Sequence, residues 1–213
     1  KKKYKIQIQS ITCDFFMQRP FYKKKFETYQ DKIFNYLKIL IKNSSNLNVK
    51  YLILPLVDKS SLENKNEEKK LIFNISKLEK LLKKKKIQIL FECDYEPKKL
   101  KSFIKKFNTK FFGINYDTGN STNLNYKFEK EMINYRYIKN VHLKDRKING
   151  FSKRFGKGDT NFKKIISFFE KNNYKGKYIF QSYVPVSKNS YKEFKMNLNF
   201  IKKILRKNDK NKK

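Results

Sequence analysis

The sequence contains no alanine and no tryptophan, and it has only six glycines and four prolines among its 213 residues. Such a composition excludes collagen-like chains and Pro/Gly-rich disordered chains. No apolar run approaches the roughly 18 to 20 residues that a membrane span needs, so no membrane partner is expected. No secretory signal peptide is visible at the start of the sequence. These absences, with a length suited to one well-buried domain, predict a cytoplasmic globular protein.

Cysteine is also scarce. Cys13 and Cys93 are the two cysteines, and they lie far apart without a CxxC motif. Isolated cysteines of this kind favour free thiols in a reducing compartment over a disulfide framework.

The net charge is strongly one-sided, with 53 Lys and Arg against 19 Asp and Glu, for a formal charge of +34. A charge of this size suggests nucleic-acid binding. However, only five of the basic residues are arginine, which is the side chain best suited to bidentate phosphate contacts. Residues with GC-rich codons are depleted and residues with AT-rich codons are enriched, so an AT-rich genome explains the lysine excess. We therefore do not expect nucleic acid as the partner, beyond weak and salt-sensitive binding.

Short apolar segments alternate with amphipathic segments along the whole chain. The predicted strands are 4–12, 49–57, 87–91, 111–116, 137–141 and 177–180. The predicted helices are 26–42, ended by a turn cluster at 43–46, then 67–86, 98–107, 127–134, 161–171 and 191–205. This alternation predicts a parallel α/β protein, either an open doubly wound sheet or an eight-stranded barrel with two β-α units fewer. We predict one domain over 1–206 and a basic tail over 207–213.

Four successive predicted strands end on residues that can bind metal. They are Glu92, Asp117, His142 and Gln181. Parallel strands bring their carboxyl ends to one face, where sites are built. Two carboxylates, one imidazole and one amide oxygen suit a single Mn²⁺, Mg²⁺, Co²⁺ or Zn²⁺ ion. Polar strand ends and lone structural histidines are common, so the prediction of a metal site depends on finding all four on successive strands. Asp145 is predicted to hold the imidazole or a neighbouring lysine in place.

Five short motifs give the sequence a more specific resemblance. They are Cys13-Asp14-Phe15-Phe16-Met17, Leu54-Pro55-Leu56-Val57-Asp58, Asn115-Tyr116-Asp117-Thr118-Gly119-Asn120, Val141-His142-Leu143-Lys144-Asp145-Arg146 and Gly156-Lys157-Gly158-Asp159. In this order they resemble the sugar phosphate isomerase/epimerase family of xylose isomerase-like TIM barrels, over about residues 5–205. The resemblance implies a (β/α)8 barrel that is truncated at its N-terminal side to about six β-α units.

The resemblance also implies a metal-dependent sugar or sugar-phosphate isomerase or epimerase. It carries the metal-ligand roles onto Glu92, Asp117 and His142, and it places Gln181 where the family has a second glutamate. A glutamine can bind metal but cannot take a proton, which favours one-base aldose–ketose isomerisation over two-base epimerisation. Glu92 is then the predicted base, with Gln181 as its catalytic partner. The metal ion is expected to polarise the sugar carbonyl and stabilise an enediolate.

The substrate side of the site is less specific. Asn120, Lys144 and Arg146 are predicted to contact a phosphate or the sugar hydroxyls, with ordinary surface charge as the alternative for the two basic residues. An inactive or non-catalytic barrel fragment is the alternative function, and its open sheet edges would favour homo-oligomers. An endonuclease IV-like protein is less favoured, because its three-zinc site needs several histidines and this chain has one.

Overall fold

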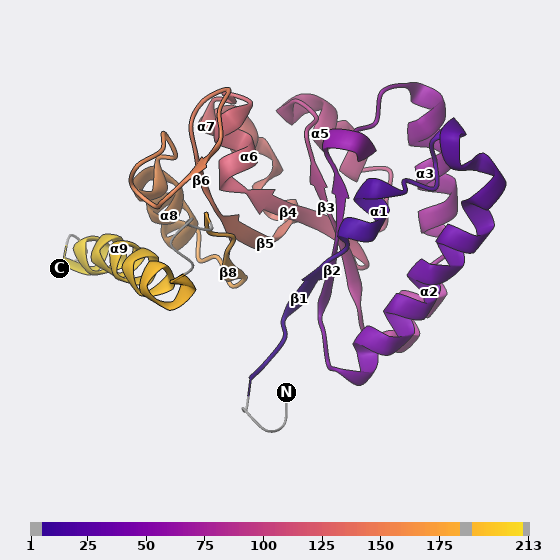
Figure 1. Cartoon of the computed structure of the whole chain (residues 1–213), viewed down its shortest axis with the longest axis horizontal. Coiled ribbons are helices and arrows are strands. Elements are labelled where there is room, and N and C mark those ends of the chain that lie inside the picture. The colour runs from indigo at the N-terminus through magenta and orange to yellow at the C-terminus, as the bar shows by residue number, and fades with distance from the viewer. Residues whose placement is uncertain (1–5, 184–188, 211–213) are drawn as a thin grey trace. The chain divides into compact units, whose positions relative to one another are not determined.

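The computed structural model describes residues 6–183 and 189–210 (Figure 1). The chain forms two compact units, Lys1–Asn115 and Tyr116–Lys213. The prediction of a single domain over 1–206 stays a prediction. No helix within 6–183 and 189–210 is long and apolar enough to cross a membrane.

The first unit is built on parallel strands. They are β1 (Ser10–Thr12), β2 (Tyr51–Leu56), β3 (Gln88–Cys93) and β4 (Phe112–Asp117), whose last two residues belong to the second unit. Every residue of β2 and β4 is buried, which is the pattern of parallel strands covered on both faces. The predicted strand 4–12 is shorter in the structure, which begins β1 at Ser10, and its first two residues lie outside the described range.

The helices of the first unit correct two predictions. They are α1 (Asp14–Gln18), η1 (Lys24–Tyr29), α2 (Gln30–Asn46), η2 (Asp58–Ser60), α3 (Lys65–Ser76), α4 (Glu79–Lys85) and α5 (Pro97–Ile104). The predicted turn cluster 43–46 is helical, because Ser44 is buried in the core and the left-handed stop comes later, at Asn48. The predicted helix 67–86 is two helices, and the break before Glu79 keeps Leu78 and Leu82 buried. Pro97 does begin its helix, as predicted.

The second unit contains the end of β4 and two further parallel strands. They are β5 (Ile138–Leu143) and β8 (Lys177–Phe180). Its helices are α6 (Thr118–Asn123), α7 (Phe128–Glu131), η3 (Met132–Tyr137), α8 (Phe162–Lys171) and α9 (Ser190–Lys210). The sequence pattern predicts neither α6 nor the small hairpin of β6 (Asp145–Arg146) and β7 (Ser152–Lys153), because both are held by side-chain hydrogen bonds rather than by apolar periodicity. Helix α9 extends into the predicted tail, as far as Lys210.

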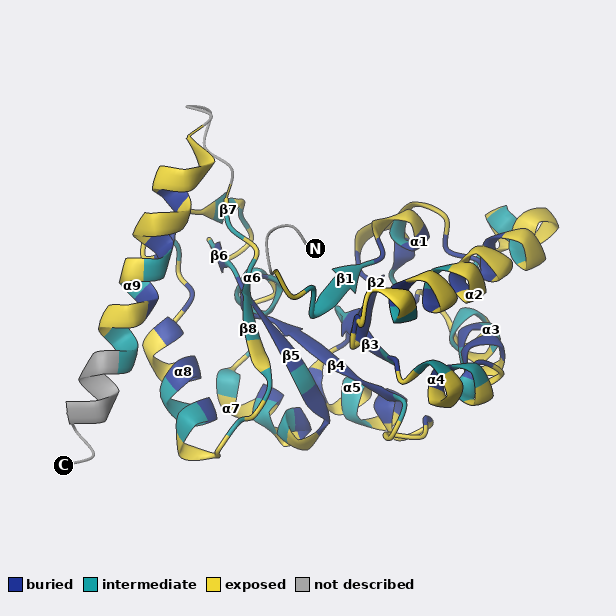
Figure 2. Cartoon of the chain, turned by 90° about the horizontal axis from the view of Figure 1, so that it is seen from below, coloured by how far each residue is buried: buried dark blue, intermediate teal, exposed yellow. Residues whose placement is uncertain are grey.

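The strands of the main sheet follow one another in the order β1-β2-β3-β4-β5-β8. An order without a reversal is that of a barrel wound in one direction, whereas a doubly wound sheet reverses at a switch point. The six predicted β-α units are therefore confirmed, and so is the barrel-type alternative. Figure 2 shows the buried residues along β4 and β5 and the exposed residues on the outer face of α9.

Candidate metal centre

Glu92 lies near the end of β3 and is buried, with 6% of its surface exposed. In the pairing of β3 with β4, Phe91 lies opposite Ile114. The next residue on β4 is Asn115, and its Nδ2 donates a hydrogen bond of 2.7 Å to Oε2 of Glu92. The bond fixes the Glu92 carboxylate on the sheet. Sequence reasoning gave Asn115 no role, although it stands two residues before Asp117 and hence on the same face of the strand.

Asp117 ends β4, and its side chain is fully buried. Its Oδ1 accepts hydrogen bonds of 2.8 Å from the backbone N–H groups of Gly119 and Asn120, so Asp117 caps the N-terminus of α6. Its Oδ2 lies 3.9 Å from the Lys144 ammonium. The carboxylate is therefore held at a fixed position, with the Lys144 ammonium beside it.

His142 lies on β5 and is 3% exposed. It pairs with Ile179 of β8, and the backbone N–H of Gln181 continues this ladder by donating 3.0 Å to the Leu143 carbonyl. The Gln181 side chain differs from the other predicted ligands because it is exposed. Strand β8 is the last in the strand order, so within residues 6–183 and 189–210 no further strand of the sheet pairs with its outer side.

Contacts with Thr118 and Gly119 position the Lys144 side chain so that its ammonium lies near Asp117. Its backbone N–H and carbonyl both bond the Thr118 hydroxyl, at 2.9 and 2.8 Å. A Cβ at position 119 would lie 2.6 Å from Cγ of Lys144, so only glycine lets the lysine stem cross the start of α6. The Asp-Thr-Gly and His-Leu-Lys motifs thus contact each other within the second unit, because Lys144 packs against all three residues of the first motif.

The other predicted substrate residues bond to each other. Nη1 of Arg146 donates 3.2 Å to Oδ1 of Asn120, while its Nε and Nη2 donate to the Gly150 carbonyl at 3.1 and 2.9 Å. The guanidinium therefore joins α6 to the β6–β7 hairpin. Substrate binding by Asn120, Lys144 and Arg146 stays a prediction.

Asp145 is 1% exposed and organises the loop that follows the hairpin. Its Oδ2 accepts from the backbone N–H groups of Gly156, Lys157 and Gly158 at 2.8, 3.2 and 2.9 Å, and its Oδ1 accepts from Thr160 at 3.2 Å. A Cβ at position 158 would lie 2.1 Å from Oδ1, so the loop needs glycine there. The first three residues of the Gly-Lys-Gly-Asp motif thus surround the Asp145 carboxylate with backbone N–H donors. The predicted support of the imidazole by Asp145 stays a prediction.

Glu131 is a buried carboxyl group that sequence reasoning missed. Its carboxyl oxygens accept from the Tyr116 hydroxyl at 2.9 Å and the Ser121 hydroxyl at 2.5 Å, so it links α7 to β4 and α6. Burial raises the pKa of Glu131 to about 7. It lines a small cavity of about 130 Å³ in the second unit. The available signal was an acidic residue three positions after Phe128, on the apolar face of its helix.

We expect Glu131 to make stability depend on pH. Its folded-state pKa of about 7 lies above its usual value of 4.5, so the stabilising contribution is complete below about pH 4.5 and is lost as pH rises through 7. The contribution is on the order of 3 kcal/mol. Urea unfolding at pH 5 and pH 8 should show a steeper loss of stability for the wild type than for Glu131→Gln. Parallel pH profiles for the two proteins would contradict this assignment.

The fold and the strand-end residues define a class: a parallel α/β barrel with carboxylates and an imidazole at consecutive strand ends. The family model for the xylose isomerase-like TIM barrel matches residues 1–204. The chain belongs to the xylose isomerase-like TIM barrel family. None of the curated proteins matches the chain.

Solved structures share the fold at low sequence identity. A D-tagatose 3-epimerase-like protein is 15% identical with a TM-score of 0.74, covering 100% of this chain and 93% of that protein. A xylose isomerase-like TIM barrel protein from Mycobacterium smegmatis in complex with magnesium is 15% identical with a TM-score of 0.74, covering 97% and 76%. The IOLI protein with a bound zinc atom is 14% identical with a TM-score of 0.70, covering 87% and 72%. At these identities the likeness establishes the fold.

Proposed function

We propose that this protein is a metal-dependent sugar or sugar-phosphate isomerase or epimerase. Glu92, Asp117 and His142 would hold one divalent ion, with Gln181 as the fourth ligand. The observation that carries the proposal is the chemistry of the first three: all are buried, and each offers one carboxylate oxygen or imidazole nitrogen as a ligand. The magnesium complex from Mycobacterium smegmatis and the zinc-bound IOLI protein, which share the fold, support a divalent ion. The D-tagatose 3-epimerase-like protein, a third structure of this fold, supports a sugar as substrate.

The residues present fit such an ion in charge and in rigidity. Asp117 already has the Lys144 ammonium beside it, and the proposed ligand set adds a second carboxylate, Glu92, whose negative charge a divalent cation would compensate. The bond from Asn115 orients Glu92, and the α6 N–H groups orient Asp117, as supporting groups do around metal ligands. Mn²⁺, Mg²⁺, Co²⁺ and Zn²⁺ all accept this mixture of oxygen and nitrogen ligands.

In this proposal, the ion would supply Lewis-acid polarisation of the sugar carbonyl when bound. Glu92 would remove a proton from the carbon beside the carbonyl and return it to the former carbonyl carbon by way of an enediolate, while the hydroxyl proton passes from one of the two oxygens to the other. The hydrogen bond from Asn115 holds the Glu92 side chain in place for this role. Gln181 orients a substrate oxygen and takes no proton, so isomerisation on one face is favoured over inversion by two bases. Lys144, Arg146 and Asn120 would bind the sugar hydroxyls or a phosphate.

The test is metal content. We expect one divalent ion per purified chain and loss of that ion in His142→Ala, measured by elemental analysis and by calorimetric titration with Mn²⁺ and Zn²⁺. Lys139→Ala, on the same strand, is the matched control and should keep the ion. Circular dichroism shows whether each variant retains its secondary structure. If His142→Ala binds metal as tightly as wild type, the proposed site is wrong.

A non-catalytic barrel is the second candidate, and the exposure of Gln181 favours it. A chain that binds metal but converts none of the common aldoses, ketoses or their phosphates would support this second candidate. Turnover of any of them would exclude it.

A further inference from the structure

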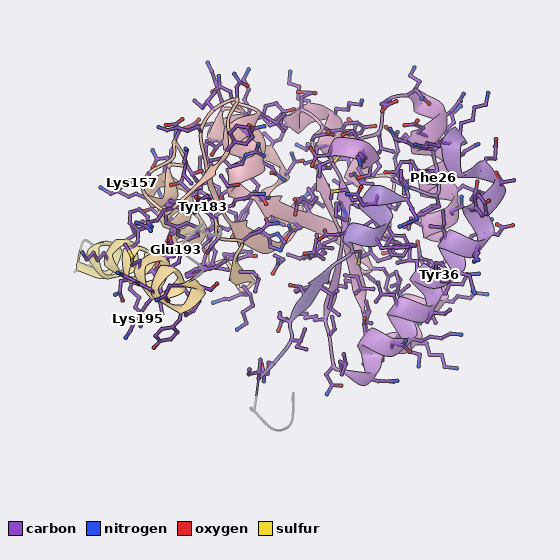
Figure 3. All side chains as sticks on the ribbon, viewed as in Figure 1. Phe26, Tyr36, Lys157, Tyr183, Glu193 and Lys195 are labelled. Carbon is purple, nitrogen blue, oxygen red and sulfur yellow. The ribbon has the colours of Figure 1, made fainter. Side chains whose placement is uncertain are left out.

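The first unit carries a second pocket, lined by none of the residues assigned to the metal centre. Its volume is about 490 Å³, which is the size of many small-molecule sites. Residues of α1, η1 and α2, with Arg19 just after α1, form its walls. Figure 3 labels two of the lining residues, Phe26 and Tyr36, on the first unit.

Four aromatic side chains supply most of the apolar wall. They are Phe15, Phe26, Tyr29 and Tyr36. Phe15, Tyr29 and Tyr36 are 39%, 62% and 41% exposed, although large aromatic side chains are usually buried. The rings of Phe15 and Tyr36 meet edge to face, with centroids 5.7 Å apart. Exposed rings of this kind offer flat surfaces on which another aromatic ring can stack.

The charged part of the wall is entirely basic. Arg19, Lys25 and Lys32 line the pocket, and none of the acidic residues that the structure describes does. The Arg19 guanidinium lies over the Phe15 ring, 5.2 Å from its centroid. Among the residues that the structure describes, it forms no side-chain hydrogen bond and no ion pair. An arginine held on an aromatic ring with its N–H donors uncommitted is suited to bind phosphate.

The other arginines whose side chains are described donate hydrogen bonds to partners within the protein. Arg146 bonds the Gly150 carbonyl and Asn120, Arg154 forms a bidentate pair with Glu193, and Arg136 bonds the Tyr137 hydroxyl. Genome bias accounts for many lysines but not for an arginine, of which the chain has only five. The position of Arg19 is therefore informative in a way that the net charge is not.

We propose that this pocket binds a nucleotide. The base stacks on the exposed ring of Tyr36, with Phe15 beside it at a steep angle, and the phosphate pairs with Arg19, supported by Lys25 and Lys32. The ligand chemistry, a planar aromatic base joined to a phosphate, is shared by a free nucleotide and by one nucleotide of a single strand. The proposal is independent of the metal centre and of the sugar chemistry.

The test is calorimetric titration of the full chain with adenosine 5′-monophosphate, adenosine and ribose 5-phosphate. We expect the monophosphate to bind at least about tenfold more tightly than either part alone, because the base and the phosphate are recognised together. Arg19→Gln and Tyr36→Ala should each weaken its binding by about tenfold or more. Both residues are exposed, so neither change should unfold the chain. Tyr191→Ala, an exposed tyrosine on α9, is the matched control and should bind like wild type.

An unchanged affinity in both pocket variants would overturn the proposal, and so would ribose 5-phosphate binding as tightly as the nucleotide. An octameric single-stranded oligonucleotide distinguishes the two sources. Binding much tighter than the monophosphate, and weakened by the same substitutions, identifies a single strand as the natural ligand. Binding no tighter than the monophosphate identifies a free nucleotide.

Discussion

Replacing Glu92 with glutamine is expected to abolish turnover of the sugar substrate, with kcat falling by about 10³-fold or more. Glutamine keeps the size of the side chain and can still bond Asn115 through its amide oxygen, so the fold should survive. What it loses is the ability to take a proton from carbon. The measurement is the conversion rate of the sugar found by a screen of pentoses, hexoses and their phosphates.

Two controls separate loss of the base from other causes. Glu129→Gln removes an exposed glutamate that pairs with Lys164 and lies outside the proposed site, so its turnover should equal that of wild type. Metal content measured on the Glu92→Gln variant shows whether the ion is retained. A variant that holds the ion but has lost turnover supports the base role, whereas a variant with the wild-type rate rules it out.

Replacing Asp145 with asparagine is expected to lower the free energy of unfolding by about 3 to 5 kcal/mol. The carboxylate accepts four backbone N–H bonds from the loop at 156–160. An asparagine turns one acceptor oxygen into a donor that faces these N–H groups inside the core. Since Asp145 is 1% exposed, water cannot replace the lost bonds.

Urea unfolding followed by circular dichroism measures this effect. The matched control is Asp159→Asn in the same loop, whose carboxylate bonds the Lys147 ammonium and the Ile148 N–H nearer the surface. We expect a much smaller loss of stability there, because solvent screens the ion pair and can satisfy the freed groups. Equal losses in the two variants would mean that the loop, rather than the buried anchor, sets the stability.

Much of the architecture could be predicted from local patterns. Alternating strands and helices predicted six β-α units, and residues 177–180 form the predicted sixth strand. Pro97 and the apolar runs of β2 and β4 also behaved as their local chemistry indicates. These features depend on residues near each other in sequence, so the spacing of apolar residues predicts them directly.

Features held by polar contacts were missed. Helix α6 exists because Asp117 caps it, and the predicted turn at 43–46 is helical because the core buries Ser44. The bond between Asn115 and Glu92 joins residues on two paired strands. The bond between Asn115 and Glu92 depends on the register of β3 against β4, and the burial of Ser44 depends on tertiary packing, so neither shows in a local pattern. The cap of α6 is local, but a helix of six residues without apolar periodicity gives no helix signal.

By itself, the sequence determined the family-type motifs, the order of the β-α units and the identity of the candidate metal ligands, because spacing and residue chemistry are local properties. The roles of the surrounding residues depend on how the chain folds. In the folded chain, the Asp145 carboxylate accepts hydrogen bonds from the loop that follows the hairpin, and the Lys144 side chain passes over Gly119 to reach Asp117. Arg19 lines the aromatic pocket of the first unit. These roles arise from contacts between distant segments, which exist only once the chain has folded.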